Sequence, residues 1–70
     1  MRTFRQLNAV FEKIINSDMP DRVKNLKLMK LLSEIVRDYK INDKQWEECE
    51  KENPEVISLY RKISNYLNFN

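Results

Sequence analysis

The chain contains no glycine, and this absence limits its fold more than any other feature. Two-residue β-hairpin turns of the favoured types rely on glycine, because their central residues need positive φ angles. Apolar side chains recur every three or four residues instead of alternating with polar ones, which is the spacing of amphipathic helices. The sequence therefore predicts an all-α fold: a single domain over residues 1–70, built as a small three- to four-helix bundle.

The first predicted helix covers residues 4–16. Thr3 and Gln6 have the spacing of a capping box, in which two side chains satisfy backbone N–H groups at a helix start. For the next helix, Asp18 is the expected cap and Pro20 suits the first turn. The apolar face of the first helix consists of Phe4, Leu7, Val10, Phe11, Ile14 and Ile15.

The second predicted helix, residues 19–40, is the longest. Leu28, Leu32, Ile35 and Tyr39 form one line at helical spacing and are expected to face the core. Leu31 lies on one flank of this line. The apolar face is therefore wide enough to touch two neighbouring helices.

A short acidic helix over residues 43–51 and a longer helix over residues 54–67 complete the prediction. In the short helix only Trp46 and Cys49 are apolar, so these two side chains are expected to anchor it. Asn53 and the proline after it mark the boundary, because Asn is a preferred N-cap and Pro favours the first helical position. The last helix is expected to bury Val56, Ile57, Tyr60, Ile63 and Leu67.

The residue types that perform most catalysis are missing. Without histidine there is no imidazole base and no Ser-His or Cys-His pair, and without glycine there is no phosphate-binding loop. The single cysteine, Cys49, can neither form an intramolecular disulfide nor complete a zinc site. We therefore expect no enzymatic activity, no cofactor and no metal.

Hydropathy and cysteine content predict a compartment. The chain lacks the run of about 18 apolar residues that a membrane span requires, and its first residues do not lead into an apolar signal segment. With one cysteine, this predicts a cytoplasmic protein without membrane association. The many Asn, Lys and Ile residues are typical of AT-rich genomes, so a small bacterial or phage protein is expected.

Acidic charge is concentrated in residues 42–55, which contain six acidic and two basic side chains. Aromatic side chains, which are enriched in protein interfaces, gather in the same half of the chain. We therefore predict a non-catalytic protein-binding module (an adaptor, regulator or inhibitor) whose acidic residues steer a basic partner. That partner is another protein or a second copy of the chain. The candidate partner-binding residues are Trp46, Glu47, Glu48, Glu50, Tyr60 and Tyr66.

Two alternatives stay open. One is a nucleic-acid-associated regulatory protein that binds phosphates through a basic face of the second helix, and the other is a self-associating structural module. A net charge of only +2 and the lack of a recognisable helix-turn-helix make nucleic acid the weaker prediction. The candidate basic face consists of Lys24, Lys27, Lys30 and Arg37.

Overall fold

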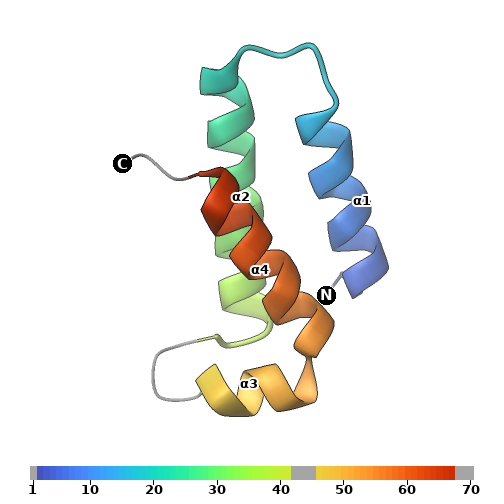
Figure 1. The fold of residues 1–70 in the computed structure, drawn as a ribbon, viewed down its shortest axis with the longest axis vertical. Coiled ribbons are helices and arrows are strands. Elements are labelled where there is room, and N and C mark those ends of the chain that lie inside the picture. The colour runs from blue at the N-terminus through green and yellow to red at the C-terminus, as the bar shows by residue number, and fades with distance from the viewer. Residues whose placement is uncertain (1, 42–45, 68–70) are drawn as a thin grey trace.

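A computed structural model of the chain describes residues 2–41 and 46–67, which form four α-helices and no strand. They are α1 (Phe4–Ile15), α2 (Asp21–Asp38), α3 (Trp46–Glu52) and α4 (Pro54–Tyr66). α1 and α2 lie side by side and run antiparallel, α4 crosses this pair on one side, and α3 lies across one end of the bundle (Figure 1). The predicted all-α bundle is confirmed.

The capping box at the start of α1 is confirmed. The backbone N–H of Gln6 donates to Thr3 Oγ1 at 3.3 Å, and the backbone N–H of Thr3 donates to Gln6 Oε1 at 2.9 Å. These reciprocal bonds satisfy two of the N–H groups that a helix start leaves without partners. α1 therefore begins where the sequence predicted and ends one residue earlier.

The start of α2 differs from the prediction. Pro20 is the N-cap residue instead of a first-turn residue, and no side chain, Asp18 included, caps the helix. Asp21 follows in the first turn, where a carboxylate is favoured by the helix dipole. The helix is therefore two residues shorter at this end than predicted.

The end of α2 forms a Schellman-type turn without glycine. Lys40 takes a left-handed conformation with φ of 52°, and the Ile41 N–H donates to the Val36 carbonyl at 3.1 Å. Ile41 is buried, so the turn directs an apolar side chain back into the core. A residue with a Cβ is disfavoured in this conformation, so burial of Ile41 offsets local backbone strain.

All four helices contribute to one apolar core, but the buried line of α2 differs from the predicted one. Leu28, Leu31 and Ile35 are buried, whereas Leu32 is half-buried. The reason is the position of α1, because Leu31 lies with Ile14 of α1 where the two helices meet, so the Leu31 side of α2 faces α1. The buried apolar residues are Leu7, Phe11, Ile14, Leu28, Leu31, Ile35, Ile41, Cys49, Val56, Ile57, Leu59, Ile63 and Leu67.

In the second half of the chain, the start of α4 lies where it was predicted, but one predicted contact is absent. Asn53 is the N-cap residue of α4 and Pro54 opens the helix, but the Asn53 side chain makes no capping hydrogen bond. Cys49 is buried as expected, and Tyr60 is half-buried. The predicted start of the acidic helix at residue 43 lies outside the described residues. Among the helices that are described, none is both long and apolar enough to cross a membrane.

Candidate functional site

The aromatic candidates near α3 pack against one another. The rings of Trp46 and Tyr60 meet edge to face, with centroids 5.4 Å apart and planes inclined by 67°. The guanidinium of Arg61 lies 5.4 Å from the centroid of the Trp46 ring, within cation–π range. These contacts fasten α3 to α4 and use part of the aromatic surface that was expected to meet a partner.

The acidic candidates are more exposed than the aromatic ones. Glu47 and Glu48 are exposed, while Glu50 forms an ion pair with Arg61 at 3.4 Å. Tyr66 is 45 % exposed and lies elsewhere, with its ring against Phe11 of α1. The structure thus brings Trp46 and Glu50 together with Tyr60, whereas Tyr66 lies at the other end of α4 (Figure 1).

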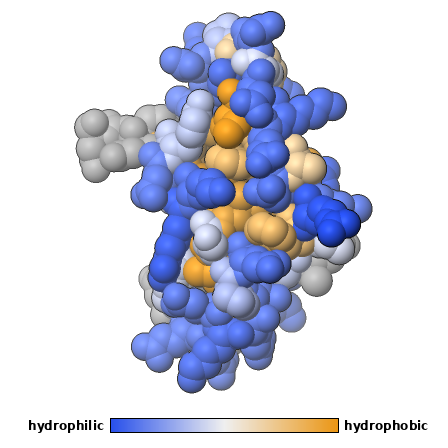
Figure 2. Space-filling model, turned by 45° about the vertical axis from the view of Figure 1, so that its right-hand side comes forward, coloured by the Kyte–Doolittle hydropathy of each residue, from blue (hydrophilic) through white to orange (hydrophobic). Residues whose placement is uncertain are grey.

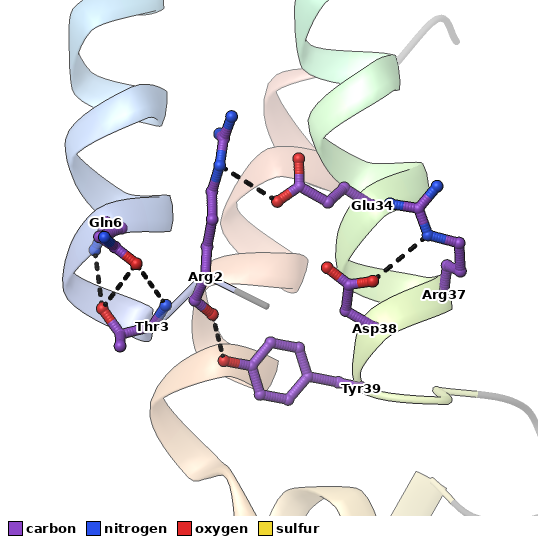
Figure 3. A network of polar contacts seen from close by, with 7 residues as sticks. All are labelled: Arg2, Thr3, Gln6, Glu34, Arg37, Asp38 and Tyr39. Atoms are coloured by element: carbon purple, nitrogen blue, oxygen red, sulfur yellow. Dashed lines mark hydrogen bonds and ion pairs between the residues drawn. The ribbon is translucent and has the colours of Figure 1, made fainter.

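The predicted basic face of α2 does not form one surface. Lys24 donates to the Ile15 carbonyl at 3.3 Å, so its ammonium caps the end of α1. Arg37 pairs with its neighbour Asp38 at 3.3 Å (Figure 3). Lys27 and Lys30 remain, and both lie along a groove between α1 and α2.

This α1–α2 groove has a volume of about 670 Å³. Its walls come from Arg2 before α1, from α1 and α2, and from the turn between these helices, and no α4 residue is in its lining. Ile14 and Leu31 form an apolar floor and are only 7 % and 3 % exposed. The lining residues are Arg2, Val10, Lys13, Ile14, Ser17, Met19, Lys27, Lys30, Leu31 and Glu34.

The charged side chains of the groove are mostly basic. Arg2 and Lys13 come from the first segment of the chain, and Lys27 and Lys30 come from α2. The lone carboxylate of the lining, Glu34, pairs with Arg2 at 3.4 Å across one end of the groove (Figure 3). We call these four cations and Glu34 the rim.

A hydrogen bond fixes the segment that supplies Arg2. The hydroxyl of Tyr39 donates to the Arg2 backbone carbonyl at 2.7 Å and ties the chain before α1 to the end of α2 (Figure 3). The partly exposed Arg2–Glu34 pair adds little stability by itself. Together the two contacts hold the Arg2 end of the groove in place.

Sequence reasoning missed Arg2 and Lys13, because a charge search along one helix cannot find residues that tertiary packing brings beside it. A local signal did exist. Val10, Lys13 and Ile14 have i, i+3 and i+4 spacing, which places a cation beside the apolar stripe of α1. A cation in that position marks the edge of a helix interface.

A second, smaller hollow lies between α1 and α4, with a volume of about 290 Å³. Phe4 and Leu59 contribute apolar surface to it, and its charged residues are one acid, Glu55, and one base, Lys62. On the side where α1 comes forward, Figure 2 shows apolar surface in the middle of the face with hydrophilic side chains around it. This hollow is smaller than the groove, and neither positive nor negative charge predominates in its lining.

Among the described residues, no three His, Cys, Asp or Glu side chains are grouped so that they could hold a metal ion. No family model matches the chain, and neither a curated protein nor a solved structure matches it. The functional interpretation therefore rests on the groove and its chemistry.

Proposed function

We propose that this chain is a non-catalytic protein-binding module, an adaptor, regulator or inhibitor, and that a helical segment of its partner docks in the α1–α2 groove. The observation that supports this proposal most directly is that the groove between α1 and α2 is lined by the partly buried apolar side chains of Val10 and Met19, above the buried Ile14 and Leu31. Association between proteins draws most of its free energy from burying such apolar area.

The dimensions of the bundle leave one face of the α1–α2 pair without a helix among the described residues. Packed helix axes lie about 8–10 Å apart, and the molecule extends 16 Å along its shortest axis. That depth suits two layers, with α4 on one face of the α1–α2 pair (Figure 1). A helix laid along the opposite face would give the pair a neighbour on both sides.

The polar groups of the groove favour binding over catalysis. Ser17 provides the only side-chain hydroxyl in the lining, and it donates to the Ile14 carbonyl at 2.7 Å. A nucleophilic serine needs a base within hydrogen-bonding distance of its hydroxyl, whereas this hydroxyl ends a helix. The remaining polar lining groups are the rim and the backbone.

Site-specific crosslinking in the native cell tests the proposal. A photoreactive amino acid at Val10, which lines the groove, is expected to give a discrete protein adduct. The same probe at Glu12, which is exposed and outside the groove lining, is the matched control. Excess unlabelled wild-type protein should compete the Val10 adduct away, and a Met19→Glu variant should not. Equal adducts from both positions would refute the docking site.

One observation favours a second candidate function, phosphate binding. The rim adds Arg2 and Lys13 to the predicted Lys27 and Lys30, so four cations border one groove. A nucleic-acid complex would lose affinity steeply between about 50 and 200 mM salt. Binding of the protein releases counterions from the phosphates, and added salt opposes that release. Such a complex would leave the apolar floor without a role, and we therefore rank it second.

A further inference from the structure

The rim carries charge of mainly one sign around the apolar lining of the groove. No carboxylate among the described residues forms an ion pair with Lys13, Lys27 or Lys30, while Glu34 is occupied by Arg2. Lys13 stands on the α1 wall, and Lys27 and Lys30 stand on the α2 wall. Positive charge therefore flanks the floor on both sides.

We infer that the segment that docks here is an acidic amphipathic helix of another protein, about two turns long, with carboxylates on both flanks of an apolar ridge. This inference rests on the proposed docking function and adds the chemical nature of the partner. Helix-in-groove recognition uses apolar anchors at i and i+3 or i+4. Glu or Asp beside those anchors would meet the lysines of either wall.

The length of the docked segment follows from helix geometry. Lys27 and Glu34 mark the extent of the groove along α2, and Val10 and Ile14 line it on α1. Seven residues at a rise of 1.5 Å span about 10 Å, and two helical turns span about 11 Å. The floor therefore accepts two anchor side chains, one per turn.

The recessed floor argues against a membrane surface as the occupant. Ile14 and Leu31 lie below the rim and are nearly inaccessible. A bilayer binds apolar side chains that project into it, whereas this floor can be reached only by a side chain that projects into the groove. The same geometry suits the ridge of a helix.

The acidic helix of a second copy, α3, does not match the groove. α3 is acidic, but its apolar residues point inward: Cys49 is buried and Trp46 packs on Tyr60. Docking α3 of another copy would therefore present carboxylates without an apolar ridge. This mismatch favours a different protein as the partner.

Stapled helical peptides of about three turns are suitable probes. The test peptide has leucine at i and i+4 with glutamate on both flanks, and the matched peptide has lysine in place of every glutamate. Each is titrated into the isotopically labelled full chain up to about 1 mM, which detects even weak binding. We expect the glutamate peptide to shift the amide signals of Val10, Lys13, Lys27 and Lys30 and to bind about tenfold more tightly than the lysine peptide.

Charge variants test the rim. Lys27→Glu with Lys30→Glu should weaken binding of the glutamate peptide at least about tenfold, because attraction becomes repulsion. Arg5→Glu with Arg22→Glu changes the net charge equally at exposed positions outside the groove and should alter the affinity less than about twofold. Equal losses in the two double variants would show that net charge, not the groove, governs binding and would overturn the inference.

A methionine pair tests the apolar contact. Met19 lines the groove, whereas Met29 is 47 % exposed and does not. Met19→Ala should weaken binding of the glutamate peptide several-fold, and Met29→Ala should leave it unchanged. The amide spectrum of each variant confirms that it is folded, and an unchanged affinity for a folded Met19→Ala would count against an apolar anchor in this groove.

The remaining outcomes separate this inference from the docking function. Equal or tighter groove binding by the lysine peptide would overturn the acidic partner but leave helix docking standing. Groove amides that respond to neither peptide would overturn the inference, while the crosslinking experiment judges the docking function independently. Stronger shifts of these amides with anionic vesicles, with duplex DNA or with increasing protein concentration would identify a membrane, a nucleic acid or a second copy as the occupant and would overturn it as well.

Discussion

The α1–α2 groove and the acidic end of the molecule at α3 relate charge to apolar surface in opposite ways. In the groove, cations border an apolar lining of Val10, Ile14, Met19 and Leu31. At α3, the large apolar ring of Trp46 is engaged by Tyr60 and Arg61, so charge projects from a surface that is already packed. Both regions stand out by charge, but only the groove also offers recessed apolar area to a partner.

This difference matters because charge and apolar area contribute differently to binding. An exposed ion pair contributes about 0–1 kcal/mol and is screened by salt. Apolar burial contributes about 25 cal/mol per Å², although association costs reduce the net gain. We therefore expect exposed Glu47 and Glu48 to affect the rate of an encounter, and the groove to determine how long a complex lasts.

The largest expected effect concerns the floor of the groove. Leu31→Ala removes a side chain that is both floor and core, so it should lower the free energy of unfolding by about 2–5 kcal/mol. Leu32→Ala, at the half-buried neighbour, should cost clearly less. Urea unfolding measures both. The reverse order would place the buried line of α2 through Leu32.

Such a loss can exceed the whole stability of a small domain. Leu31→Val deletes less and should cost about 1 kcal/mol, so it keeps the comparison measurable if Leu31→Ala does not fold. Its matched control is Leu32→Val.

The next effect concerns the acidic end. Trp46→Ala removes the edge-to-face contact with Tyr60 and the cation–π contact with Arg61, and should cost about 1–3 kcal/mol. Trp46→Phe retains a ring against Tyr60 and should recover part of the loss. Hydrogen exchange should show faster exchange of α3 amides in the alanine variant. Unchanged exchange there would mean that the Trp46 ring does not hold α3 on α4.

A smaller effect, which raises the free energy of unfolding instead of lowering it, is expected at Lys40 after the end of α2. Lys40 has a left-handed φ of 52°, which glycine adopts without a steric penalty. Lys40→Gly should therefore raise the free energy of unfolding by up to about 1 kcal/mol, and Lys40→Ala should give no gain. Thermal unfolding measures both. A destabilised glycine variant would show that the lysine side chain contributes more than its backbone conformation costs.

The helices could be predicted from sequence because their signals are local. Thr3 and Gln6 lie three residues apart, and the proline at the start of α4 follows its N-cap directly. The burial of Leu31 instead of Leu32 could not be predicted, because it depends on which side of α2 faces α1. Leu59 was likewise not among the residues that the last helix was expected to bury, but it is buried.

The groove was less predictable than the helices, because its rim joins residues that lie far apart in the sequence. Arg2 meets Glu34 only after α1 and α2 pack antiparallel. The predicted basic face was drawn along one helix, and packing divided it: Lys24 caps α1 while Lys27 and Lys30 line the groove. Charge patterns within one helix therefore found half of the groove's cations.

The smallest effect on stability, and the sharpest test of the comparison, concerns the acidic surface. Glu47→Lys with Glu48→Lys reverses two exposed charges in the first turn of α3, where carboxylates gain a few tenths of a kcal/mol from the helix dipole. The melting temperature should hardly change. In the crosslinking experiment, the Val10 adduct should persist in this variant and disappear in Lys27→Glu with Lys30→Glu.

The opposite pattern would place the docking surface on the C-terminal half, with Trp46, Tyr60 and Tyr66, as the sequence alone predicted. Loss of the adduct in both double variants would mean that partner contacts extend from the groove to α3, and the contrast between the two regions would then fail.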